Sequence, residues 1–224
     1  MPATSAYDMY CPIARALDVL GERWTLLIVR ELSLGEQRFT DLKRAIAGIP
    51  PNVLSARLKA LRSEGLVDTR ELPPPAARTV YLLTARGREA LPVLRSLARW
   101  GLDLLEAPEP SMPVRPVSVI GAWFVPFYDR QAAAGVDERY QLVIDGESFW
   151  LSSVPGRRAT AEGEADLVLA GPAWAFMTAR QGTRTLGDLI DDGTVVRTGP
   201  ARSLRNFERV FALGDERSPL PSER

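Results

Sequence analysis

The 224-residue sequence predicts an α+β protein with two domains. Residues 1–107 carry leucines at helical spacing in several segments and one pair of short strand-like segments. Residues 108–116 are rich in proline and hold little that a core could bury, which indicates a linker. Residues 117–217 alternate between strand-like and helix-like segments, which indicates helices packed on an antiparallel or mixed sheet. Residues 218–224 are expected to be a disordered tail.

The composition excludes several classes of function. With 46% hydrophobic and 25% charged residues, the chain should bury a globular core. It contains no histidine and one cysteine, which excludes histidine-based catalytic triads, most zinc and iron sites and an intramolecular disulfide. We therefore expect that the protein is not an enzyme and that it binds no metal and no cofactor. The N-terminus lacks a signal-peptide pattern, and the longest apolar stretch, residues 117–127, is too short to span a bilayer. A cytoplasmic protein without a membrane partner is expected.

Four helices begin the first domain. Apolar spacing predicts one helix that ends at Gly21 and a second that closes near Gly35. A third is expected to start with Thr40 as its N-cap and to end before Gly48. The fourth should run from Pro51, a residue suited to the first helical position, to Gly65, which is suited to the stop.

Two strands and a long helix complete the first domain. Residues 66–72 and 79–83 read as strands, and PPPAAR between them is too long and proline-rich for a tight turn. Thr84 is expected to cap a helix of about twenty residues that ends at Glu106, with Pro92 as a possible bend. This order of elements is that of a winged helix-turn-helix domain, in which the second helix of the pair enters the major groove of DNA.

The fourth helix has the surface that such a role requires. Leu54, Leu58 and Leu61 share one face, and the opposite face is short, polar and mildly basic. Arg57 lies near the edge of the core, so it can pair within the protein or touch phosphate. Each candidate contact could also be a solvated surface charge. The residues expected to contact DNA are Asn52, Ser55, Ala56, Arg57 and Lys59 from this helix, Thr40 and Lys43 from the preceding helix, and Arg78 from the wing.

The distribution of charge agrees with this assignment only weakly. Residues 1–107 hold 15 Arg and Lys against 12 Asp and Glu, whereas residues 108–224 hold 13 against 16. The two halves therefore differ in sign although the formal net charge is zero. A polyanion should bind the first half.

Three runs between Cys11 and Trp100 carry a resemblance to a known family: CPIARALDVLGERWTLLIVRELSLGEQRFTDLKRAIAGI, LSARLKALRSEGLV and YLLTARGREALPVLRSLARW. With these runs the first domain resembles the HxlR family of bacterial transcriptional regulators. The resemblance implies a homodimer that pairs through its terminal helices and binds double-stranded operator DNA with an inverted repeat. Pro50 stands where the family usually has a serine-like cap, and PPPAAR also departs from the usual wing. Cys11 matches the thiol sensor of some relatives, although a lone cysteine beside an apolar helix is usually a small buried hydrophobe.

The second domain shows a looser resemblance. YQLVID-G-ESFWLSSV predicts two strands joined by an Asp-Gly turn, ADLVLA and TVVR predict two more strands, and helices are expected over residues 172–178, 185–190 and 202–211. The run DLVLAGPAWAFMTARQGTRTLGDLIDDGTVVRTG resembles the sterol-carrier-protein-2-like domain, which implies an apolar ligand held between sheet and helices. Candidate ligand contacts are Trp123, Phe124, Phe127, Phe149, Trp150, Trp174, Phe176 and Met177.

Together these patterns predict a dimeric transcription factor whose affinity for its operator is controlled by an apolar small molecule in the second domain. Three alternatives stay open. Cys11 could sense oxidants while the second domain acts as a scaffold, the second domain could be a lipid carrier, or it could use Asp and Glu in catalysis. The eight apolar residues of the second domain could also simply form its core.

Overall fold

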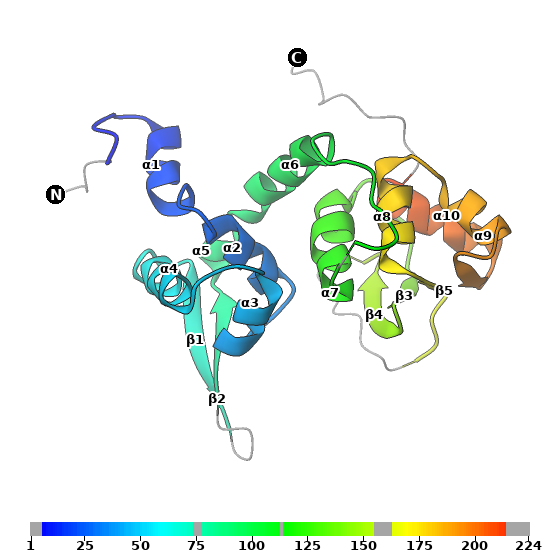
Figure 1. Ribbon diagram of the computed structural model, residues 1–224, viewed down its shortest axis with the longest axis horizontal. Coiled ribbons are helices and arrows are strands. Elements are labelled where there is room, and N and C mark those ends of the chain that lie inside the picture. The colour runs from blue at the N-terminus through cyan, green and yellow to red at the C-terminus, as the bar shows by residue number, and fades with distance from the viewer. Residues whose placement is uncertain (1–5, 74–77, 113, 155–162, 214–224) are drawn as a thin grey trace. The chain divides into compact units, whose positions relative to one another are not determined.

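The computed structural model describes residues 6–73, 78–112, 114–154 and 163–213 (Figure 1). The chain divides into two compact units, Met1–Leu97 and Ala98–Arg224. The sequence predicts that the first domain ends at residue 107. The first compact unit ends earlier, at Leu97, which lies inside a helix. The predicted disordered tail and most of PPPAAR lie outside the described residues. Within the described ranges, no helix is both long and apolar enough to cross a membrane.

The first unit consists of helices and one two-stranded ribbon. Its elements are α1 (Pro12–Leu20), α2 (Thr25–Ser33), α3 (Phe39–Ala45), α4 (Pro51–Ser63), β1 (Val67–Leu72), β2 (Arg78–Leu83), α5 (Ala85–Arg88) and the start of α6 (Leu91–Leu102). β1 and β2 are antiparallel, with Val67 opposite Leu83, and their ribbon extends away from the helices (Figure 1). The order and pairing give the winged helix-turn-helix fold that the sequence predicts.

The core of this unit holds α4 in place. Leu54, Leu58 and Leu61 are almost fully buried in a cluster that includes Ile28 of α2 and Leu42 of α3. The end of α4 is fixed by Thr84, whose hydroxyl donates to the carbonyl of Gly65 at 2.6 Å and accepts from the amide of Gly87 at 3.0 Å. Thr84 therefore caps α5, as predicted, and also ties α5 to the end of α4.

Two boundaries in the first unit differ from the sequence-based expectation. The N-cap of α3 is Arg38, not Thr40, because a bridge between Gln37 and Tyr81 keeps the chain extended up to that point. Asp41 then accepts a hydrogen bond from the amide of Arg38 at 3.3 Å and fixes the first turn.

The predicted single helix from Thr84 to Glu106 is also wrong. It is broken after Arg88 into α5 and α6. Pro92 lies at the second position of α6, where its missing N–H costs nothing, whereas a continuous helix would bring its ring against the carbonyl four residues earlier.

Gly87 is a point of close approach in this unit. A Cβ at this position would lie 2.0 Å from the carbonyl oxygen of Leu66, whereas a Cβ at Gly101 in α6 would meet nothing within 4 Å. We expect Gly87→Ala to lower the free energy of unfolding by about 1 to 3 kcal/mol, because α5 must move away from the backbone. Gly101→Ala should leave it unchanged or raise it by up to about 1 kcal/mol. Urea denaturation followed by circular dichroism compares the two; equal effects would contradict this packing.

The second unit places helices on a four-stranded sheet. After α6 its elements are α7 (Pro116–Val119), the π-helix η1 (Ile120–Phe124), the 3-10 helix η2 (Val125–Phe127), β3 (Arg139–Ile144), β4 (Glu147–Ser152), β5 (Leu167–Gly171), α8 (Ala173–Gln181), α9 (Leu186–Asp191), β6 (Val196–Thr198) and α10 (Ala201–Val210). The strand order is β4-β3-β5-β6, and only the β3–β5 pair is parallel. The described sheet is therefore mixed, and the α+β class is confirmed.

Sequence features explain the main turns of this sheet. Asp145 and Gly146 join β3 to β4 with positive φ angles of 48° and 83°, as the Asp-Gly turn predicts. Burial alternates along β3, where Tyr140, Leu142 and Ile144 are fully buried. Their face of the sheet contacts the helices, because the ring of Tyr140 lies 5.1 Å from that of Phe207 in α10.

Arg180 ties the helices of the second unit together from inside. Its side chain donates from Nε to the carbonyl of Trp123 at 2.7 Å, from Nη1 to that of Ala212 at 2.9 Å and from Nη2 to that of Phe211 at 2.5 Å. Burial, and secondarily the charge of Arg99, lowers the pKa of Arg180 to about 9. The guanidinium thus remains protonated at neutral pH and keeps its donors.

The substitution Arg180→Met should weaken the second unit strongly. It would leave three carbonyl groups near the end of α10 and in η1 without their donor, so we expect the free energy of unfolding to fall by about 2 to 4 kcal/mol. Arg180→Lys should recover little of the lost stability, since one ammonium group cannot reproduce the planar set of donors that the guanidinium provides. Calorimetry of the full chain measures the loss of stability. Full recovery of stability in Arg180→Lys would contradict the role assigned to the guanidinium donors.

Candidate nucleic-acid interface

The outer face of α4 has the shape that close approach to DNA requires. Asn52, Ser55, Ala56 and Lys59 are all exposed and recur every three or four residues, so they form one stripe along the helix. The buried leucines lie on the opposite face. Thirteen residues give a helix about 20 Å long, which can lie in a major groove. Pro50 provides no side-chain cap, as the sequence indicates.

The neighbouring elements add further candidates. Thr40 is exposed at the second position of α3, and Lys43 on the same helix is half-exposed. Arg78 is exposed at the start of β2, so it belongs to a strand and not to the connecting loop. Arg62 in the last turn of α4 is exposed as well. Arg62 is not among the DNA contacts predicted from the sequence, although its position about one turn after Lys59 could have indicated it.

Arg57 differs from the other candidates because it has a partner inside the protein. Its Nη2 lies 3.0 Å from Oε2 of Glu22, in the turn between α1 and α2. Its side chain is 28% exposed, and its Nε is buried without a hydrogen-bond partner among the described residues. Of the two roles that the sequence leaves open for Arg57, the structure shows the internal pair. No sequence spacing could have indicated Glu22 as the partner.

Comparison with known proteins bears on the first unit. The HxlR-like helix-turn-helix model matches residues 19–109. An uncharacterized HTH-type transcriptional regulator of Synechocystis sp. is 38% identical over 96 residues, which are 43% of this chain and 71% of the relative. The uncharacterized HTH-type transcriptional regulator YvaP of Bacillus subtilis is 36% identical over 97 residues, which are 43% of this chain and 90% of YvaP.

This chain belongs to the HxlR-like helix-turn-helix family. The structure of the reduced form of the transcriptional regulator YodB from B. subtilis is 30% identical and covers 45% of this chain and 100% of that one, with a TM-score of 0.39. As an HxlR-type protein, the chain is a transcriptional regulator with a DNA-binding first domain. The family match ends at residue 109, so it assigns nothing to the second unit.

The structure separates the predicted ligand contacts of this HxlR-type protein into two groups. Phe124, Phe127, Phe176 and Met177 are buried, and the rings of Phe124 and Phe176 meet edge to face with centroids 6.2 Å apart. The other four, Trp123, Phe149, Trp150 and Trp174, are half-exposed.

The sheet divides the half-exposed residues further. Phe149 is paired with the buried Leu142, and Trp150 is paired with Gln141 on the opposite face. The guanidinium of Arg139 lies 5.2 Å from the ring of Trp150 on that face. Trp150 therefore does not meet Phe124 or Phe176, and the eight residues do not line a single cavity.

Cys11 occupies the N-cap position of α1 and is half-buried. Its carbonyl accepts the amide of Arg15 at 3.0 Å, and its side chain caps nothing. The guanidinium of Arg15 instead faces Asp18 and Glu64, at 3.5 Å and 3.2 Å. The charge of Arg15, one turn along α1 from Cys11, is thus directed to carboxylates.

Proposed function

We propose that this protein is a homodimeric repressor or activator that binds an inverted-repeat operator through the exposed face of α4. One observation carries the proposal. The single helix that the fold presents as the second member of a helix-turn-helix pair exposes only small, polar or basic side chains, while its leucines are buried. Small side chains let a helix approach base edges closely, and Asn52 and Lys59 supply donors for bases and phosphates.

Exposed apolar side chains support the homodimer. Val93, Leu97 and Trp100 of α6 are 49%, 44% and 67% exposed, and Leu104 just beyond the helix is 65% exposed. They recur every three or four residues and form one stripe. Ile13 in α1 is also 70% exposed. An apolar stripe of this kind on a terminal helix marks a protein interface, and a second copy of this chain fits the two-fold symmetry of an inverted repeat.

We further propose that the second unit takes up an apolar small molecule that changes operator affinity. The half-exposed Trp123, Phe149 and Trp174 are the side chains that such a molecule can reach without opening the core. The test titrates the fatty-acid analogue cis-parinaric acid into the full chain with and without operator. Linkage requires the two affinities for the probe to differ by the factor by which the probe changes operator affinity, roughly 5- to 150-fold. Tight binding with equal affinities would leave a carrier or scaffold role.

Selection of binding sites from random double-stranded DNA tests the main proposal. The expected result is an inverted repeat whose half-sites lie about one helical turn, roughly 34 Å, apart. A fragment that ends at Ala107 should select the same sequence, because the 97 residues that YvaP shares with this chain make up 90% of YvaP. Selection of a single unrepeated site, or of no site, would contradict the proposal.

A further inference from the structure

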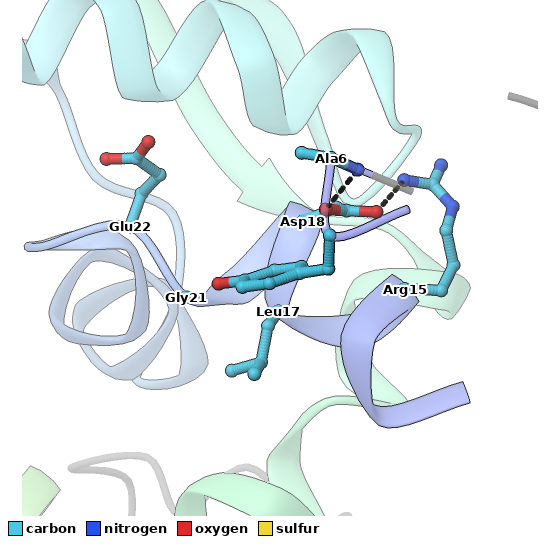
Figure 2. Close-up of a pocket in the computed structure, with 7 residues that line it drawn as sticks. Ala6, Arg15, Leu17, Asp18, Gly21 and Glu22 are labelled. Carbon is cyan, nitrogen blue, oxygen red and sulfur yellow. Dashed lines mark hydrogen bonds and ion pairs between the residues drawn. The ribbon is translucent and has the colours of Figure 1, made fainter. Parts of the chain in front are cut away.

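A cavity of about 340 Å³ lies beside α1 in the first unit (Figure 2). This volume falls in the range of small-molecule sites. Its walls come from the segment before α1, from α1 itself and from the turn into α2. The lining residues are Ala6, Tyr7, Arg15, Leu17, Asp18, Gly21 and Glu22. None of them is among the candidate DNA contacts, so the cavity is a separate feature of the domain.

Asp18 gives this cavity a specific polar group. Its side chain is only 9% exposed, and Oδ1 accepts the amide of Ala6 at 3.1 Å. Oδ2 accepts no hydrogen bond from the described residues, although Nη1 of Arg15 lies 3.5 Å away. Figure 2 marks this ion pair with a dashed line. A buried carboxylate oxygen without a hydrogen-bond donor is costly. Oδ2 therefore favours a ligand that brings an N–H group.

The surrounding charges favour a cation. Two carboxylates, those of Asp18 and Glu22, line the cavity together with one guanidinium group, that of Arg15. Arg15 is shared between Asp18 and Glu64, and Glu22 is paired with Arg57, which lies outside the lining. The charged residues of the described lining thus carry one surplus negative charge, which a monovalent cation offsets.

The remaining walls suit a ligand with a carbon framework. Tyr7 and Leu17 contribute an aromatic and an aliphatic surface beside the carboxylates. An aromatic ring can also attract an ammonium group through its π-face. A bare metal ion gains nothing from contact with apolar side chains. An amine with an apolar substituent can contact both the carboxylates and the apolar side chains.

We propose that this cavity is an effector site for a small organic monocation, a protonated amine that carries an apolar or aromatic group. The ammonium donates to Oδ2 of Asp18, and the apolar group of the ligand contacts the turn that carries Glu22, another lining residue. Because the carboxylate of Glu22 holds Arg57 of α4 at 3.0 Å, a shift of this turn weakens that ion pair and changes operator affinity. This last step rests on the proposed function of α4, whereas binding of the amine does not.

Calorimetric titration of the full chain with benzylamine tests the site, with neutral benzyl alcohol and anionic benzoate as matched probes. Benzylamine should bind, and the other two should bind roughly tenfold more weakly or worse. Asp18→Asn should weaken benzylamine binding by a similar factor, since it removes the charge and keeps the shape. Glu89→Gln makes the same charge change at an exposed residue outside the cavity lining and should have no effect.

A second variant guards against misfolding of Asp18→Asn. Leu17 is 43% exposed, so Leu17→Trp can fill the cavity without disturbing a buried carboxylate, and it should abolish benzylamine binding. Circular dichroism checks that both variants are folded. No benzylamine binding to the wild type, or unchanged binding in both folded variants, overturns the proposed site.

Operator titrations with saturating benzylamine test the coupling. In the wild type, operator affinity should change by roughly 5- to 150-fold, and Glu22→Gln should abolish this change because Arg57 is already released. An unchanged operator affinity in the wild type overturns the coupling and leaves the amine site. If substitutions on α4 leave operator affinity unchanged, the proposed function is wrong. The titrations without DNA still show whether the cavity binds the amine.

Discussion

Ala56→Glu should abolish specific operator binding while the protein stays folded. Ala56 is exposed on the stripe of α4 that we assign to the groove, so a longer side chain does not disturb the core. Bound to DNA, the new carboxylate would face phosphates and base edges at close range. Repulsion and loss of fit should cost about 3 kcal/mol or more, a loss of roughly 100-fold in affinity. A gel-shift titration with the selected operator measures the effect.

Smaller substitutions on the same stripe separate two kinds of contact. Lys59→Ala should reduce the slope of log affinity against log salt by about one unit if the ammonium contacts a phosphate. Asn52→Ala should cost about 1 to 3 kcal/mol and relax the sequence preference if the amide reads a base.

The same charge placed elsewhere is the control for this series. Ala85→Glu introduces a carboxylate at an exposed position of α5 and should leave operator affinity within about threefold of the wild type. Should Ala56→Glu bind the operator as well as Ala85→Glu does, the assignment of α4 to the groove would be wrong.

Local chemistry made most of the first unit predictable. The leucine spacing of α4, Pro51 at its start and Gly65 after its end each act within a few residues, and the helix follows them. The start of α3 was missed because it depends on Gln37 pairing with Tyr81, a contact between segments distant in sequence. Hydrophobic residues also recur at helical spacing on both sides of Pro92. This pattern therefore predicts one continuous helix where the structure has α5 and α6.

The second unit shows where sequence patterns fall short. The Asp-Gly hairpin and the burial along β3 follow from local rules, but the parallel pairing of β3 with β5 does not. Glu138 is a clearer case. It is 6% exposed and accepts hydrogen bonds from Tyr140 at 3.0 Å, Ser203 at 3.1 Å and Asn206 at 2.9 Å.

Nothing in the spacing of these four residues marks them as a cluster, because α10 must first pack on the sheet. Once packed, burial and then the neighbouring carboxylate of Glu138 raise the pKa of Tyr140, so its hydroxyl stays a donor. The candidate functional residues also divide into those that local patterns predict and those that depend on tertiary contacts. Exposure of α4 was predictable from its own periodicity, whereas the Glu22–Arg57 pair and the cavity around Asp18 depend on tertiary contacts.

Leu97→Asp should convert the homodimer into monomers. Leu97 lies in the middle of the exposed apolar stripe on α6, so the substitution changes little in an isolated chain. In a dimer that buries the stripe, it would place a carboxylate in an apolar seam without a partner, which costs several kcal/mol. Sedimentation at micromolar concentration should show one species of half the wild-type mass, with an unchanged circular dichroism spectrum.

Operator binding should fall together with the dimer. A dimer that holds one half-site presents its second α4 to the other half-site at an effective concentration in the millimolar range, an advantage that a monomer lacks. We therefore expect Leu97→Asp to lose roughly 100-fold or more in affinity for the full operator and to bind a single half-site as the wild-type domain does. Ser96→Asp adds the same charge at an exposed position beside the stripe and should remain dimeric. If Leu97→Asp also stays dimeric, the seam lies elsewhere, and the two α4 helices are spaced by a different pair of surfaces.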